Sequence, residues 1–338
     1  MSERGTADAA FLHEACVYRS AGEFLATTLP FVRDGLRLGE PVLAVTTPAN
    51  IELIGRALGP EADRVEFVDA HSWYGTPLAT LSAYDRYVAR WTEPAGHVRV
   101  IGEPVWSSRT DRQVIDLQRY ESVLNVVFAS SPAWIVCPYD TRVLDPAVVI
   151  GARRTHPALA TSRGRVPSSE FLAPEAFFLA CDDTAPLSDA PPDAAVLPFA
   201  GDLGGVRRFA TTQAVLHGVA GEPAVLFAAA AGEAVAYVAD RGGDRAVVRM
   251  WANRGEIVLE VLNAAGHLPD PFPGYRPPSL LRSQPDDGLW FTRHVCEFVE
   301  IRSGEFGAVA RLHFPRPLVG HPADVNPGTP VPGLRRTH

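Results

Sequence analysis

The sequence predicts an α/β protein made of two domains, and three observations support this. Residues 11–160 alternate apolar strands with amphipathic helices, which is typical of a parallel sheet covered on both faces. Residues 161–194 are rich in Pro, Ser and Ala, as linkers are. Residues 195–316 then place two helices before a pair of strands, the order of an α/β sandwich. A chain of 338 residues also has room for two domains of ordinary size.

The amino-terminal domain is predicted to contain at least five strands with helices between them. The strand segments are apolar without alternation, as in strands buried on both faces, and the first helix ends where Gly39 interrupts it. The expected strands are Cys16–Ser20, Pro41–Thr47, Val65–Ala70, Val98–Glu103 and Ala133–Asp140. The expected helices are Ala21–Gly39, Ala49–Leu58, Thr80–Trp91 and Asp111–Ala129.

The linker and the carboxy-terminal domain follow. The linker holds one apolar stretch, Glu170–Ala180, which we expect to dock on a domain because large apolar side chains are costly to leave in water. Residues 1–10 and the Pro/Gly-rich tail 317–338 are expected to be disordered. The expected elements of the second domain are strand Val196–Leu203, helices Leu203–Gly221 and Glu222–Asp240, strands Arg245–Trp251 and Glu256–Leu262, helix Leu289–Glu297 and two final strands.

Composition excludes several classes of protein. The chain has no lysine, so all 31 of its basic residues are arginines. A P-loop, a eukaryotic-type protein kinase and a pyridoxal enzyme each need a specific lysine, and all three are therefore excluded. A net charge of −8 argues against direct binding of nucleic acid.

Cysteine usage and hydropathy predict a cytoplasmic protein. The four cysteines lie far apart and form no C-x-x-C pair, so neither a disulfide framework nor a zinc knuckle is expected. No apolar run approaches the ~20 residues of a membrane span, and the first residues do not resemble a signal peptide. No contact with a membrane is expected.

Polar and aromatic residues gather where the predicted parallel strands end. Ligands of such sheets bind at the carboxyl ends of the strands, so Glu103, Trp106, Tyr139 and Asp140 are candidate residues of a small-molecule pocket. Two alternatives remain open. The carboxylates could be helix caps or structural ion-pair partners, and the aromatic side chains could simply fill the core.

Six short motifs follow one another along this domain. They are H-x-x-x-x-Y at His13 and Tyr18, G-L-R-x-G-E at Gly35–Glu40, G-E-x-x-W at Gly102–Trp106, Y-E at Tyr120 and Glu121, C-x-Y-D at Cys137–Asp140, and T-H-P at Thr155–Pro157. Together they resemble the MEDS sensory domain of bacterial regulators that respond to small organic compounds.

That resemblance implies a RecA-like parallel sheet and a small organic ligand, with His13 added to the candidate pocket. Where a RecA relative carries its phosphate loop, this chain has Pro48, Ala49 and Asn50, with neither glycine nor lysine. Nucleotide hydrolysis by this half is therefore not expected. His13 and His156 could lie close together, but we interpret them as a structural pair, and no metal is expected.

The stretch from Gly232 to Gly242 carries a second resemblance, together with the strand pair and loop that follow. A helix with one carboxylate, Glu233, leads to a turn at Asn263–Gly266 and then to Asp287-Gly288-Leu289-Trp290. This order is similar to the ATP-binding domain of histidine kinases, gyrase and the anti-sigma-factor serine kinases. The resemblance implies that Glu233 stands at the general-base position, and that the long loop before Gly288 is the lid over ATP.

The same resemblance implies that the nucleotide site is degenerate. Tyr237 stands where the family's Asn binds Mg²⁺, and a phenol is a poor Mg²⁺ ligand. Asn263 replaces the Asp that accepts from adenine, and Asp287 replaces a phosphate-binding glycine. Gly266 and Gly288 remain as turn glycines at the phosphates.

These features predict a signalling regulator whose second half is pseudokinase-like. Weak binding of Mg·ATP is the only cofactor interaction expected. The predicted partners are a sigma factor or an anti-sigma antagonist protein, and a homodimer is possible. Two alternatives remain: an active ATP-dependent serine/threonine kinase that phosphorylates an antagonist, and a small-molecule-binding protein whose second half is only a scaffold.

Overall fold

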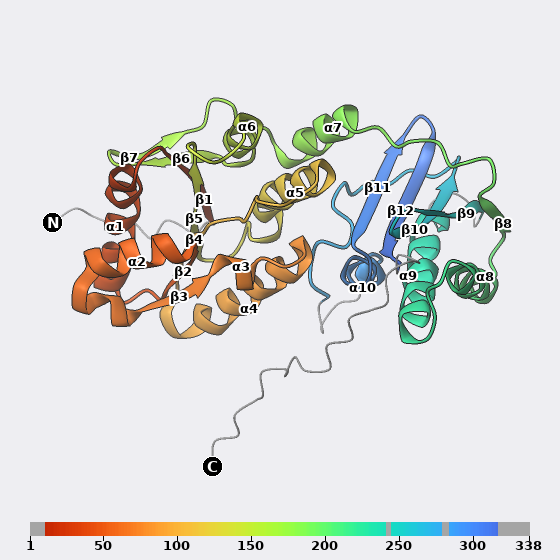
Figure 1. The fold of residues 1–338 in the computed structure, drawn as a ribbon, viewed down its shortest axis with the longest axis horizontal. Coiled ribbons are helices and arrows are strands. Elements are labelled where there is room, and N and C mark those ends of the chain that lie inside the picture. The colour runs from red at the N-terminus through yellow and green to blue at the C-terminus, as the bar shows by residue number, and fades with distance from the viewer. Residues whose placement is uncertain (1–10, 241–244, 279–283, 317–338) are drawn as a thin grey trace, which may run out of the picture.

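The computed structural model describes residues 11–240, 245–278 and 284–316. The disorder expected at residues 1–10 and 317–338 lies outside these ranges. Two α/β halves lie side by side along the long axis of the molecule, and helix α7 (Pro174–Thr184) lies between them (Figure 1).

The amino-terminal half is built on a seven-stranded sheet in the order β3-β2-β4-β5-β1-β6-β7. Neighbouring strands from β3 to β6 pair in parallel, and β7 pairs antiparallel to β6. The predicted parallel-dominated sheet is thereby confirmed. The strands are β1 (Leu12–Tyr18), β2 (Val42–Thr46), β3 (Val65–Asp69), β4 (Val98–Gly102), β5 (Ala133–Asp140), β6 (Ala158–Thr161) and β7 (Gly164–Pro167).

Strand β1 begins earlier than predicted. The expected start at Cys16 was wrong: the strand begins at Leu12, and the polar side chains of His13 and Glu14 are buried inside it. The pairing of β1 with β5 runs from Leu12 opposite Trp134 to Tyr18 opposite Asp140. The sheet also continues through β6 and β7, so it passes residue 160, where the linker was expected to begin.

Helices cover the two faces of this sheet, and their ends follow from capping residues. Ser20 caps the first helix by accepting from the N–H of Glu23, and Gly39 ends it with a φ of 75°. Thr110 and Gln113 form a capping box at the start of α5. The helical elements are α1 (Ala21–Leu38), α2 (Pro48–Leu58), the 3-10 turn η1 (Gly59–Arg64), α3 (Ala70–Trp73), α4 (Pro77–Ala95), α5 (Asp111–Val127) and α6 (Pro146–Thr155). Of these, η1, α3 and α6 were not predicted.

The carboxy-terminal half contains a separate five-stranded antiparallel sheet, in the order β11-β12-β10-β9-β8. One face packs on α9, whose alanines and valines form the core with apolar side chains of the strands. The strands are β8 (Ala195–Phe199), β9 (Ala246–Asn253), β10 (Glu256–Asn263), β11 (Phe298–Gly304) and β12 (Gly307–Pro315). The helices are α8 (Leu203–Leu216), α9 (Glu222–Ala239) and α10 (Asp287–Val295).

Helix α9 is long and apolar enough to cross a membrane by length and composition alone. It is the one such helix among the residues that the structure describes. In the structure, 61% of its apolar stretch is buried within the protein, as expected of a helix in the core of a globular domain.

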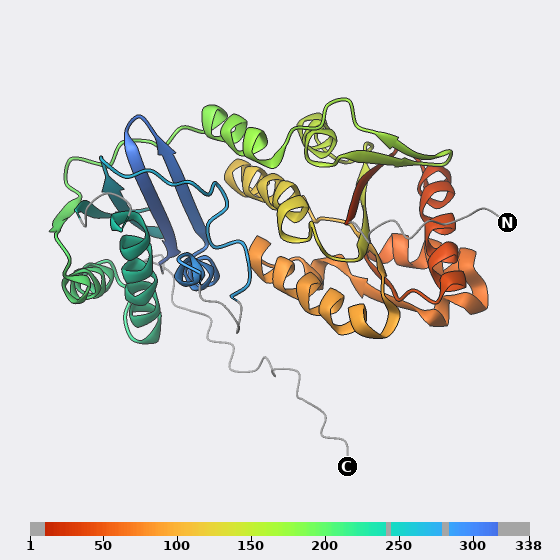
Figure 2. The ribbon, with the colours of Figure 1, turned by 180° about the vertical axis from the view of Figure 1, so that it is seen from behind.

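The apolar segment of the linker forms α7. This helix packs against α5 and α6 of the amino-terminal half, and Phe177 is buried there. Its neighbour Phe178 packs against Phe272, in the loop between β10 and α10. Seen from behind, α7 and this loop both lie where the two halves meet (Figure 2). The segment therefore contacts both domains.

Candidate functional site

The carboxyl ends of β4 and β5 border a cavity of about 380 Å³. Glu103, Trp106 and Asp140 line it, together with the loop that follows β4 and the first residues of α6. In that loop Ser108 has a φ of 62°, in the left-handed region that residues other than glycine seldom adopt. Three of the predicted pocket residues are thus brought to one cavity.

The carboxylate of Glu103 is held by donors from three other elements. Its Oε2 accepts from Asn50 Nδ2 at 2.9 Å, from the backbone N–H of Thr47 at 3.2 Å and from the Thr46 hydroxyl, while Tyr18 donates to Oε1. All four of these donors are uncharged. Glu103 therefore ties the ends of β1, β2 and β4 together at the floor of the cavity.

Asp140 and Trp106 contribute differently to the cavity. Arg142 binds both oxygens of Asp140, at 2.8 and 2.6 Å, and these bonds hold the pKa of Asp140 below its ordinary value. The Trp106 indole N–H is buried and has no acceptor among the described residues. Asp140 is thus part of a structural ion pair, while Trp106 supplies an aromatic wall.

Tyr139 and His13 lie outside this cavity. Successive side chains of a strand point to opposite faces, so Tyr139 points away from its neighbour Asp140. Its ring instead stands edge-on to His156, with ring centroids 5.7 Å apart. His13, on β1, faces the same side of the sheet, and its ring centroid lies 4.0 Å from that of His156 with the two rings tilted by 39°.

His13 and His156 belong to a buried polar cluster with Glu121 and Cys137. One nitrogen, oxygen or sulfur atom from each lies within 4.8 Å of the corresponding atoms of the other three. His156 Nε2 is 3.3 Å and His13 Nε2 is 3.7 Å from Glu121 Oε2, and Cys137 Sγ is 3.5 Å from His13 Nε2. All four side chains are buried.

Burial and neighbouring groups shift the pKa values of His13, Glu121 and Cys137. Burial, with the neighbouring His156, lowers the pKa of His13 to about 4. Burial alone would raise the pKa of Glu121, but the two imidazoles outweigh it and lower that pKa to about 2. Burial next to Glu121 raises the pKa of the Cys137 thiol.

Comparison with known proteins bears on this half of the chain. Residues 12–157 match the family model MEDS, described as the methanogen/methylotroph, DcmR sensory domain. The amino-terminal half thus matches a sensory domain. The match covers the strand-end cavity and the buried cluster, and it indicates a role in sensing and signalling. No curated protein matches the chain.

The MEDS match ends before the linker, so the resemblance of the second half to ATP-binding domains stays a prediction. There, Glu233 on α9 lies against Gly288 at the start of α10: a Cβ added at Gly288 would lie 2.3 Å from Glu233 Oε2. Arg207 approaches the other oxygen of Glu233 at 3.5 Å. The carboxylate at the predicted general-base position is therefore half-exposed and beside an arginine.

Asn263 has a structural role at the end of α9. Its amide nitrogen donates to the carbonyls of Val238 and Ala239, at 3.2 and 3.4 Å, and its Oδ1 accepts from the N–H of Ala265. An aspartate could not make the first two bonds. Gly266 follows in the same turn, where a Cβ would lie 2.9 Å from the Cβ of Ala308.

The two other substituted positions also belong to the packing of this domain. Tyr237 is 4% exposed and lies in the apolar core. Asp287 is the first residue of α10, and its Oδ2 accepts from the N–H of Gln284 at 2.8 Å. The residues that depart from the ATP-binding pattern therefore make contacts within the domain.

The loop predicted to be an ATP lid packs against the amino-terminal half. Within its described part, Phe272 and Tyr275 are buried in the same apolar cluster as the side chains of α4 and α5. Phe178 of α7 stands edge-on to both rings, at 4.9 and 6.1 Å. Arg293 of α10 stacks on Tyr275, with its guanidinium carbon 4.0 Å from the ring centroid.

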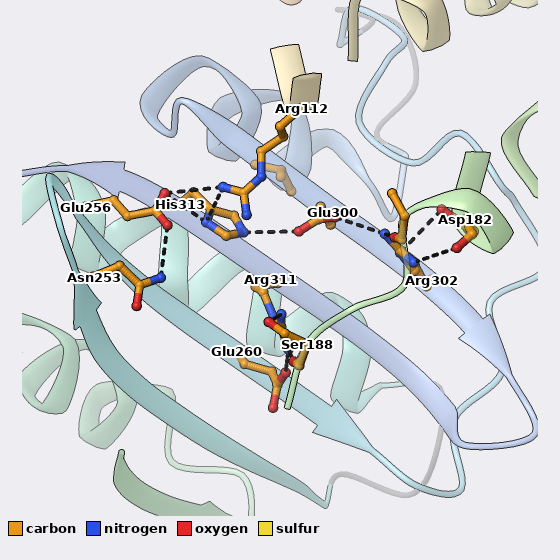
Figure 3. A network of polar contacts seen from close by, with 12 residues as sticks. Arg112, Asp182, Ser188, Asn253, Glu256, Glu260, Glu300, Arg302, Arg311 and His313 are labelled. Carbon is orange, nitrogen blue, oxygen red and sulfur yellow. Dashed lines mark hydrogen bonds and ion pairs between the residues drawn. The ribbon is translucent and has the colours of Figure 1, made fainter. Parts of the chain in front are cut away.

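Sequence reasoning missed a network of charged residues on the face of the second sheet that α9 does not cover (Figure 3). His313 lies between two carboxylates, 3.1 Å from Glu256 and 3.1 Å from Glu300. Arg112, from α5 of the first half, approaches Glu256 at 3.3 Å. Burial alone would lower the pKa of His313, but hydrogen bonds to the two carboxylates outweigh it and raise the pKa.

Arginines of the same face bind the linker. Arg302 donates to the carbonyl of Ala185 at 2.7 Å and pairs with Asp182, which also pairs with Arg119 of the first half. Arg311 donates to the carbonyl of Ser188 at 2.7 Å (Figure 3). The sequence did contain a signal for this network, because charged residues stand at every second position of the last strands. It did not show which surface these residues contact.

Proposed function

We propose that this chain is a cytoplasmic signalling regulator that senses a small organic molecule and responds by binding another protein. The match of residues 12–157 to a sensory domain supports the first part. The ligand would bind in the strand-end cavity, against the ring of Trp106 and the neighbouring side chains of Val105 and Leu144. A small molecule with an apolar part suits this wall.

The single observation that carries the proposed output is the position of the loop before α10. Phe272 and Tyr275 of this loop are buried against the first half and α7, so the segment that would close over ATP is used as an interdomain contact. A change of shape in the sensor would reach the second domain directly through these side chains. The loop would therefore transmit changes between the two domains and would not take part in catalysis.

The second domain would act by holding a protein partner. Because this domain resembles anti-sigma-factor serine kinases, we propose that the partner is a sigma factor or an antagonist protein. ATP turnover would be absent, because Asn263 and Tyr237 are committed to the packing of the domain. A charge-assisted hydrogen bond to a nucleotide is worth about 1.5–3 kcal/mol, so the removal of two or three such bonds would move a micromolar site into the millimolar range.

Isothermal titration of the full chain with Mg·ATP tests the proposed loss of ATP binding and turnover. We expect no binding tighter than millimolar and no transfer of labelled phosphate to a sigma factor or an antagonist protein. A micromolar dissociation constant together with phosphate transfer would favour the active kinase instead.

A second experiment tests the sensor. Small organic molecules that co-purify with the chain would be identified by mass spectrometry and titrated against the wild type and Trp106→Ala. We expect binding to the wild type to be lost in the variant, and a ligand that binds both equally would contradict the assigned cavity. If the ligand binds but does not change the affinity for the partner, the second half is a scaffold.

A further inference from the structure

Four potential metal ligands meet inside the amino-terminal half, outside the strand-end cavity. His13 comes from β1, Glu121 from α5, Cys137 from β5, and His156 from the residue that ends α6. Strands β1 and β5 are neighbours and His13 pairs with Ile135, two residues before Cys137, so His13 and Cys137 point to the same face. We propose that these four side chains bind one divalent transition-metal ion, zinc or a close chemical equivalent.

The spacing of the atoms suits tetrahedral coordination. With metal–nitrogen bonds of about 2.0–2.1 Å and a metal–sulfur bond of about 2.3 Å, neighbouring ligand atoms of a tetrahedral site lie roughly 3.3–3.6 Å apart. The measured separations are 3.3 Å between His156 Nε2 and Glu121 Oε2, 3.5 Å between Cys137 Sγ and His13 Nε2, and 3.7 Å between His13 Nε2 and Glu121 Oε2. These three separations are close to tetrahedral values, and all four ligand atoms lie within 4.8 Å of one another.

Both imidazoles are oriented by contacts on their outer side. His13 Nδ1 lies 3.1 Å from Asn125 Oδ1, and His156 Nδ1 lies 2.8 Å from the carbonyl of Ala152. Donation by Nδ1 to these oxygens leaves each Nε2 as an unprotonated lone pair that faces the cluster. This is the arrangement of metal-bound histidines, whose second nitrogen is held by an oxygen acceptor.

Within the described chain, several polar atoms inside the cluster are unpaired. Both oxygens of Glu121 and Nε2 of His156 are buried and meet no hydrogen-bond partner among the described residues. A buried carboxylate is costly without a compensating charge. A cation at the centre satisfies all of these groups together.

The four protein ligands indicate which metal would bind and what it would do. Thiolate and imidazole favour zinc and its neighbours over Mg²⁺ and Ca²⁺, which prefer oxygen ligands. Four protein ligands leave no open position, so the ion would hold β1, β5, α5 and the end of α6 together and would not activate water. This proposal replaces the sequence-based expectation that no metal binds.

The test uses the full chain, purified without a polyhistidine tag from cells grown with added zinc, and measures metal by mass spectrometry. We expect one equivalent of zinc per chain, and less than a tenth of that in Cys137→Ser. Cys16→Ser is the matched control, because Cys16 and Cys137 are both 1% exposed on neighbouring strands and only Cys137 is in the cluster. The control should keep its zinc.

Cobalt substitution of the wild type tests the ligands even if a variant fails to fold. A tetrahedral cobalt spectrum with a thiolate charge-transfer band is expected, and the melting temperature should fall when a chelator removes the metal. The proposal is overturned if the folded wild type carries no metal and neither zinc nor chelator changes its melting temperature. It is equally overturned if the zinc persists in a folded Cys137→Ser variant.

Discussion

Phe178 of the linker helix and Phe272 of the loop before α10 pack edge to face, with ring centroids 4.9 Å apart. The two residues are far apart in the chain, and they join a segment attached to the sensor to a segment of the second domain. Asp182, one helical turn after Phe178, pairs with Arg119 on one side and Arg302 on the other. Apolar and charged contacts of α7 thus act together at the junction of the halves.

Phe178→Ala is expected to weaken this junction. It removes a half-buried ring that touches Phe272 and Tyr275, at a cost of about 2 kcal/mol in the free energy of unfolding. Urea denaturation measures the decrease, and hydrogen exchange of the loop before α10 should rise. Leu179→Ala is the control, because Leu179 is 63% exposed and its change should cost almost nothing. Equal effects of the two variants would mean that the ring contact does not hold the halves together.

Asn263→Asp is expected to destabilise the second domain by about 1–3 kcal/mol. The change removes two donors from the carbonyls that end α9 and places a negative charge at the negative end of the helix dipole. Asn263→Ala removes the same bonds without adding charge, so it should cost less, and urea denaturation of both variants separates the two effects. An aspartate variant as stable as the wild type would show that these bonds contribute little.

The same position tests the resemblance to ATP-binding domains. The triple variant Tyr237→Asn, Asn263→Asp, Asp287→Gly restores the family's pattern and is expected to bind Mg·ATP more tightly than the wild type, as titration would show. Its stability should fall, because Asn263 and Asp287 each make a hydrogen bond that the replacement cannot make. Unchanged affinity in a folded triple variant would contradict the resemblance.

The charged network predicts a specific dependence of stability on pH. The pKa of His313 is raised in the folded state, so its contribution is fully present below the unfolded value of about 6.5 and is lost as pH rises through the folded pKa. The pKa values of Glu256 and Glu300 are lowered to about 2, so their contribution is lost only as pH falls toward that value.

Urea midpoints of the wild type and His313→Gln, measured between pH 5 and 9, test this sign. The difference between the two proteins should be largest near pH 6 and should shrink toward pH 9. A difference that grows with rising pH would mean that His313 is neutral in the folded protein.

The sequence by itself determined the alternation of elements. Short apolar runs between helical patterns, such as Ala133–Asp140, favour strands buried on both faces, and local caps such as Ser20 and Gly39 fix helix ends. The parallel-dominated sheet was therefore predictable. The strand-end residues Glu103, Trp106 and Asp140 could also be grouped, because parallel strands end at one edge of their sheet. These inferences need only local periodicity and one rule of topology.

Tertiary structure alone decided which distant groups meet. The motifs singled out His13, Glu121, Cys137 and His156, but only the pairing of β1 with β5 and the packing of α5 and α6 on the sheet bring them within 4.8 Å of one another. Likewise, the charges of the last strands were visible, whereas the linker and α5 that cover them were not. Periodicity reports which face a side chain occupies, and it does not report what that face contacts, because the contact depends on pairing between elements far apart in the chain.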